Sequence, residues 1–82
     1  MDYDKDKVDE AVLALLHLTR HADEFGSRAW KGHDWDALDR LYENGLISSP
    51  RSKAKSVALT DEGETASEAA FRKLFGKDSK QS

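Results

Sequence analysis

The sequence lacks cysteine and has no long hydrophobic run, and each absence excludes a class of protein. Without cysteine, the fold contains neither a disulfide framework nor a cysteine-ligated zinc site. The longest apolar run, AVLALL, is far shorter than the ~20 residues that a membrane-spanning helix needs. The N-terminal stretch MDYDKDKVDE is acidic, whereas a secretory signal peptide begins with basic residues. We therefore expect a soluble, cytoplasmic protein.

Basic residues are also in the minority, since 13 Lys and Arg stand against 16 Asp and Glu and the formal net charge is -3. Nonspecific affinity for nucleic acid comes mainly from Lys and Arg that neutralise phosphates. The overall charge therefore argues against purely electrostatic binding to nucleic acid. The 82 residues, 38% of them hydrophobic, suffice for one small domain of marginal stability. We expect a single domain over residues 1–76 and a disordered tail over residues 77–82.

Three segments have the hydrophobic spacing of amphipathic helices. The first runs from Asp6 to about Arg20, with Asp4 or Asp6 as its N-cap. The second begins after Asp34, and Gly45 lies where a left-handed residue commonly ends a helix. The third begins after a threonine N-cap at position 60 and continues to the glycine at position 76.

A β-hairpin is predicted between the second and third helices. Leu46 and Ile47 begin a short strand, SSPRSKAK forms a basic turn, and Val57 and Leu59 share one face of the returning strand. Residues 21–33 contain two glycines and no sustained period, so we expect a loop with one helical turn around residues 27–31. Within it, Phe25 and Trp30 are expected to pin the loop to the core. The sequence thus predicts an α+β domain of three helices and a two-stranded antiparallel hairpin.

The run LDRLYENGLISSPRSKAKSVALTDEG resembles the second half of the winged-helix domains of MarR- and PadR-type bacterial regulators. In those families a recognition helix ends in a Gly-Leu-Ile-like turn, a two-stranded wing follows, and a Leu-Thr-x-x-Gly segment opens the next helix. The resemblance implies a winged-helix fold that dimerises through its terminal helices. The pattern departs from those families at residues 21–33, where the short helix that normally precedes the recognition helix is not indicated. The stretches DKVDEAVLALL and AWKGHDWDALDRL also resemble a family of small uncharacterised bacterial proteins, which implies no activity.

The charge on the outer face of the second helix is unfavourable for DNA binding. Its projected outer face carries Asp36, Asp39, Arg40, Glu43 and Asn44, while the aromatic and aliphatic residues project inward. A recognition helix instead presents Arg, Lys or uncharged polar groups to bases and phosphates. Carboxylates near phosphates are repelled, so this face is predicted to contact a protein partner.

The wing carries the opposite charge. Arg51, Lys53 and Lys55 alternate along its tip, and alternation in an extended segment points all three side chains the same way. They suit phosphates, a minor groove or an acidic protein surface; alternatively, they simply solvate the hairpin and discourage edge pairing.

Large apolar residues suggest a further contact. The apolar arc of the first helix is wider than one small core can cover, and the last helix has an apolar stripe near its end. We therefore predict self-association through Leu13, Leu16, Phe71, Leu74 and Phe75. Two tryptophans, at positions 30 and 35, are candidates for an exposed anchor, although the second lies on the apolar arc of its helix and is expected in the core.

The sequence contains few motifs that are typical of catalytic or metal-binding sites. His17 and His21 have a helical i, i+4 spacing, with His33, Asp23 and Glu24 nearby in the sequence, but the spacing lacks the glutamate of an HExxH motif. No serine or cysteine nucleophile signature and no Gly-rich phosphate loop is present. We expect no enzymatic activity, no cofactor and no metal.

Two functional hypotheses follow. The first is a non-enzymatic winged-helix module that contacts another macromolecule, as a homodimer or within a regulatory complex, through the acidic helix and the basic wing. The second is a DNA-binding transcriptional regulator that uses the wing, with Arg40, Arg28 and Lys31 in support.

Overall fold

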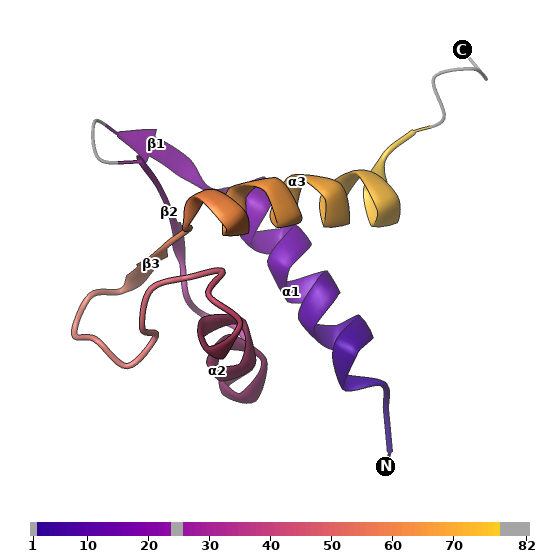
Figure 1. Ribbon diagram of the computed structural model, residues 1–82, viewed down its shortest axis with the longest axis horizontal. Coiled ribbons are helices and arrows are strands. Elements are labelled where there is room, and N and C mark those ends of the chain that lie inside the picture. Colours follow the sequence, from indigo (N-terminus) through magenta and orange to yellow (C-terminus); the bar gives the residue numbers. More distant parts are fainter. Residues whose placement is uncertain (1, 24–25, 78–82) are drawn as a thin grey trace.

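The computed structural model describes residues 2–23 and 26–77, which form an α+β domain of three helices and a three-stranded antiparallel sheet (Figure 1). The predicted fold class is confirmed. In chain order the elements are α1 (Lys5–Thr19), β1 (His21–Asp23), β2 (Gly26–Trp30), α2 (Trp35–Glu43), β3 (Ser56–Ala58) and α3 (Asp61–Phe75). Of the tail predicted to be disordered, residues 78–82 lie outside the described part of the chain, as does Phe25.

Each helix begins at a side-chain cap that the sequence predicted. Asp4 accepts a hydrogen bond from the backbone N–H of Lys7 at 3.2 Å, and Asp34 accepts one from Ala37 at 3.0 Å. Thr60 caps α3 by accepting from the N–H of residue 63 at 2.9 Å. These bonds satisfy N–H groups that have no partner within the helix, so three short polar residues fix where the helices start.

The sheet corrects the prediction of a loop with one helical turn for residues 21–33, because β1 and β2 lie within this range as paired antiparallel strands. β1 pairs with β2, and β2 pairs with β3. Ser27 and Ala29 point into the core while Arg28 and Trp30 point outward. This period of two is weak in the sequence because the inward residues are small and one of them is polar.

The hairpin predicted between α2 and α3 is present in reduced form. Its first strand contributes only the bridge between Ile47 and Leu59, reinforced by a hydrogen bond from Ser48 N to Ala58 O at 2.8 Å. The returning strand, β3, has its main partner in β2, where Val57 stands opposite Ala29. Pairing with a strand that the sequence did not reveal therefore holds the wing against the sheet.

The core lies where α1 crosses the other elements. α1 packs against α3, α2 and β2, and the buried apolar residues come from all of these and from the hairpin. They are Val12, Leu13, Leu16, Ala29, Ala37, Leu38, Leu41, Ile47, Val57 and Leu59.

Four large side chains lie where the sequence analysis did not place them. Leu13 and Leu16, which were predicted to contribute to self-association, are 5% and 0% exposed within one copy of the domain, because α2 and α3 cover neighbouring sides of α1. Trp35 was expected in the core and Trp30 was expected to pin a loop to it, yet they are 48% and 65% exposed. Their places inside are taken by smaller residues, which allow the elements to pack closely.

Gly45 ends α2 in the predicted left-handed conformation, with φ of 76°. Its N–H donates to the carbonyl of Tyr42, and the next N–H, of Leu46, reaches back to Leu41 O, each at 3.0 Å. We predict that Gly45→Val costs about 1 kcal/mol or more of unfolding free energy, because a β-branched residue resists positive φ. Gly45→Asn is the control, since asparagine tolerates this region; equal urea midpoints for the two variants would contradict the explanation.

Leu13 and Leu18 provide a matched test of the core. Leu13 is 5% exposed and Leu18, on the same helix, is 60% exposed. We predict that Leu13→Glu lowers the free energy of unfolding by at least about 3 kcal/mol, because it empties an apolar site and buries a carboxylate. Leu18→Glu should leave the circular dichroism melting curve nearly unchanged. A Leu13→Glu variant that melts like the wild type would place this side chain at the surface.

Candidate functional site

The wing, defined as residues 48–55, folds back against one side of α2. Arg51 donates through Nη2 to Asp39 Oδ2 at 2.6 Å, and its guanidinium carbon lies 5.7 Å from the centre of the Trp35 ring. Trp35, Asp39 and Tyr42 line this side of α2, because residues at i, i+4 and i+7 share one helix face. We call this surface the α2–wing face and define it by Lys31, Trp35, Asp39, Tyr42, Pro50 and Arg51.

Lys31 anchors the wing from the sheet. Its ammonium donates to the carbonyls of Pro50 and Ser52, both at 2.7 Å, and lies 5.6 Å from the centre of the Trp35 ring. Its backbone N–H donates to Lys55 O at 3.1 Å. Trp35 is thus contacted by two cations, an arrangement favoured by the negative face of an aromatic ring.

The α2–wing face is partly hollow, and its two aromatic residues are exposed. A depression of about 250 Å³ lies between α2 and the wing, lined by Asp39, Tyr42, Glu43, Ser49, Pro50 and Arg51. Trp35 and Tyr42 are 48% and 49% exposed on its α2 side. Aromatic and arginine side chains beside a concave surface are the groups that protein interfaces use most.

The basic residues of the wing do not form the aligned row that the sequence predicted. Residues 51–55 form turns and bends rather than an extended strand, so alternation does not point their side chains in one direction. Arg51 is held by Asp39, whereas Lys53 and Lys55 are exposed and have no ion-pair partner among the described residues. Arg28, the expected supporting residue, donates to Ser56 Oγ and O at 2.7 and 2.8 Å.

Arg40 lies on a different side of α2 from the one predicted. It forms a bidentate ion pair with Asp9 of α1, from Nε to Oδ2 at 2.7 Å and from Nη2 to Oδ1 at 2.8 Å. Asp36 and Glu43 are exposed as predicted, and Asp39 is half-buried beneath the wing. The outward face of α2 therefore contains carboxylates without the arginine, which is used to join two helices.

Three side chains have altered acidity. The pKa of Arg40 is raised mainly by its hydrogen bonds to Asp9, and the pKa of Arg51 is raised mainly by its hydrogen bond to Asp39. Both guanidinium groups thus remain charged. Burial lowers the pKa of His33, which lies between β2 and α2, from its ordinary value of 6.5.

The histidines considered as metal ligands have other surroundings. His17 Nδ1 accepts from Arg20 Nε at 3.1 Å and lies 3.3 Å from Ser67 Oγ, and its ring is 5.3 Å from that of Phe71. His21 lies outside the helix, in β1. Over residues 2–23 and 26–77, no three His, Asp or Glu side chains come close enough to hold a metal ion, and Glu24 is outside these ranges.

The end of α3 exposes part of the predicted self-association residues. Leu74 and Phe75 are 41% and 51% exposed, while Phe71 is half-buried between His17 and Phe75, with ring centres 5.3 and 5.6 Å away. Asp9 could not be identified from the sequence pattern, because its burial depends on pairing with Arg40, which lies far along the chain.

The family model described as a domain of unknown function, DUF6429, matches residues 4–77. The chain belongs to this family. "Uncharacterized protein y4hR" of Sinorhizobium fredii (strain NBRC 101917 / NGR234) is 56% identical to it over 75 residues, which cover 92% of this chain and 97% of that relative. No solved structure matches the chain. Membership of DUF6429 brings no activity with it, and the resemblance to MarR and PadR regulators rests on the sequence motif alone.

Within the described residues, no helix combines the length and the apolar character needed to cross a membrane.

The two Asp–Arg pairs allow a direct comparison. The Asp9–Arg40 pair has exposed side-chain fractions of 12% and 27%, whereas those of Asp39–Arg51 are 29% and 69%. We predict that Asp9→Ala clearly lowers the urea midpoint because it leaves a half-buried guanidinium without its partner. Asp39→Ala should change the midpoint little, because water replaces the lost contact. Equal midpoints for the two variants would show that burial does not distinguish the pairs.

Proposed function

We propose that this domain is a non-enzymatic interaction module that contacts another protein through the α2–wing face, as part of a cytoplasmic regulatory complex. The observation that carries the proposal is the exposure of Trp35 and Tyr42 beside the Arg51 side chain and a shallow depression. Tryptophan, tyrosine and arginine dominate the binding energy of protein interfaces when a partner excludes water from them. Lys31 and the ion pair to Asp39 hold the surface in place before binding, which reduces the ordering cost.

The absence of a poised nucleophile among the described residues supports a non-enzymatic role. Ser67 Oγ lies 3.3 Å from His17 Nδ1, the geometry of a serine–histidine pair. However, Ser67 is fully buried and its hydroxyl donates to Glu64 O at 3.0 Å. A substrate cannot reach this hydroxyl, so the contact joins α1 to α3.

The alternative, a DNA-binding regulator, has weaker support. In the winged-helix interpretation α2 is the recognition helix, and it presents the carboxylates of Asp36 and Glu43 to solvent. Of the wing cations, Arg51 is neutralised by Asp39, which leaves Lys53 and Lys55 for phosphates. Two phosphate contacts would give a salt slope of only about 1.8, since each contributes about 0.9. Because this electrostatic contribution to DNA binding is small, a protein partner is the better supported proposal.

A quantitative affinity capture tests the proposal. Immobilised wild-type domain should enrich a specific protein from bacterial extract, and Trp35→Ala together with Tyr42→Ala should reduce its recovery at least about tenfold, as expected when interface hot spots are truncated. The variant Leu18→Ala removes a similarly exposed apolar side chain from another surface and serves as the control. If no recovered protein depends on the α2–wing face, the proposal is wrong.

Titration with duplex DNA separates the two functions. We expect weak binding at physiological salt, with a salt slope near 2 or lower that disappears when Lys53 and Lys55 are changed to alanine. Specific nanomolar binding that is lost in the Arg51, Lys53 and Lys55 triple alanine variant would establish the DNA-binding alternative instead. Circular dichroism of the variant confirms that the fold is retained.

A further inference from the structure

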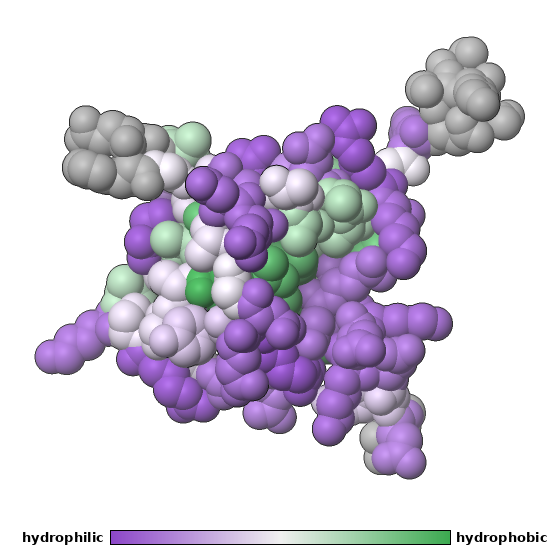
Figure 2. Space-filling view, viewed as in Figure 1, coloured by the Kyte–Doolittle hydropathy of each residue, from purple (hydrophilic) through white to green (hydrophobic). Residues whose placement is uncertain are grey.

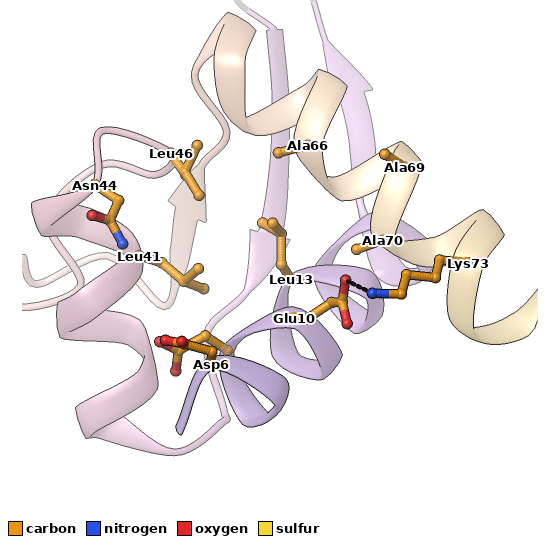
Figure 3. A pocket seen from close by; sticks show the side chains of 11 residues that line it. Asp6, Glu10, Leu13, Leu41, Asn44, Leu46, Ala66, Ala69, Ala70 and Lys73 are labelled. Atoms are coloured by element: carbon orange, nitrogen blue, oxygen red, sulfur yellow. Dashed lines mark hydrogen bonds and ion pairs between the residues drawn. The ribbon is translucent and has the colours of Figure 1, made fainter. Parts of the chain in front are cut away.

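Side chains from all three helices line an open groove (Figure 3). Its volume is about 420 Å³, and Leu13, Leu41 and Ala70 contribute to its apolar lining. A second hollow, of about 550 Å³, extends across the outer side of α3 and shares Leu46 and Ala66 with the first. The two hollows therefore form one continuous surface along α3, which we call the α3 groove.

The α3 groove is apolar in the middle and charged at its borders. Leu46 and Ala66 are half-buried and Ala69 is exposed. Figure 2 shows hydrophobic surface beside α3, bordered by hydrophilic residues. Apolar surface of this kind on a small domain commonly marks a contact with another macromolecule.

The exposed side of α3 is complementary to itself. Glu62, Ala66, Ala69 and Lys73 follow i, i+4, i+7 and i+11 spacing and so share one helix face. The two alanines lie in the middle, and Glu62 and Lys73 are equally far from the midpoint between them. When two such helices pack antiparallel about a two-fold axis through that midpoint, each glutamate lies opposite the lysine of the other helix.

We infer that the α3 groove is a homodimer interface in which α3 of a second copy packs antiparallel on α3 of the first. The alanines allow the two helices to approach closely, and Leu46 of each copy packs beside the other copy's α3. Lys73 already pairs with Glu10 at 3.2 Å, but its side chain is 70% exposed. Its ammonium has three donors, so it can also bind Glu62 of the partner subunit.

This dimer leaves the α2–wing face open. Leu41 and Asn44 border the groove, whereas Trp35, Asp39 and Tyr42 lie on another side of α2. The inference therefore does not depend on the proposed function, and a dimer would present two copies of the α2–wing face.

Charge reversal on α3 provides the test, with sedimentation velocity as the readout. The wild type should dimerise at micromolar concentration. Glu62→Lys alone and Lys73→Glu alone should each weaken the dimer at least about tenfold, because each places two pairs of like charges in contact. Mixing the two variants should restore a dimer, since both contacts between the unlike subunits are then attractive.

Matched controls use the other side of α3. Glu68 and Arg72 are exposed and form an i, i+4 ion pair with N···O of 2.9 Å. Glu68→Lys and Arg72→Glu change the charge by the same amounts, and neither should affect the dimer. Ala69→Arg adds bulk at an exposed position in the middle of the groove. This variant should sediment as a monomer, and circular dichroism should show that it is folded.

Three results would overturn the inference. They are a wild type that sediments only as a monomer at micromolar concentration, a dimer that survives Ala69→Arg, and a dimer that Glu68→Lys or Arg72→Glu weakens as much as Glu62→Lys or Lys73→Glu does. A dimer that is weakened by replacing Leu74 and Phe75 but not by the changes in the groove is the form that the second result would take if the interface lay at the end of α3, because those residues lie beyond the groove.

Discussion

Burial of one side of α1 is the constraint on which the rest of the structure depends. Leu13 and Leu16 are covered from two directions by α2 and α3, and β2 packs beside them. Burying one such leucine contributes about 1.5 to 3 kcal/mol, a large share of the net stability of a small domain. The Asp9–Arg40 pair fixes the orientation of α2 on α1 at the edge of this core. The positions of the sheet and the wing follow from that packing.

The same packing decides which charged side chains remain available to a ligand. Arg40, Arg51 and Lys31 are available to a ligand in the linear sequence, but in the fold they bind Asp9, Asp39 and wing carbonyls respectively. Cations that are already paired contribute less to binding phosphates, because their own partner must first be displaced. The exposed aromatic residues beside these cations therefore contribute relatively more to the proposed binding surface. This redistribution of charge supports the proposal of a protein partner.

The domain presents two surfaces of different chemistry on different sides of α2. The α2–wing face is aromatic and carries fixed ion pairs, whereas the α3 groove is aliphatic with charged ends. A wing held by Lys31 and Arg51 is prearranged for contact, and a self-complementary α3 is suited to symmetric pairing. The two surfaces do not share residues, so the proposed homodimer is compatible with the proposed partner contact.

The sequence by itself determined the features that depend on neighbouring residues. Asp34 and Thr60 start helices and Gly45 ends one, because capping bonds and a positive φ involve only a few adjacent residues. Only the tertiary structure decided the rest. The pairing of β2 depends on β3 as a partner, and Arg40 turned inward because α1 brings Asp9 to it. Periodicity specifies which residues share a face, but contacts with distant segments decide whether water or another helix covers that face.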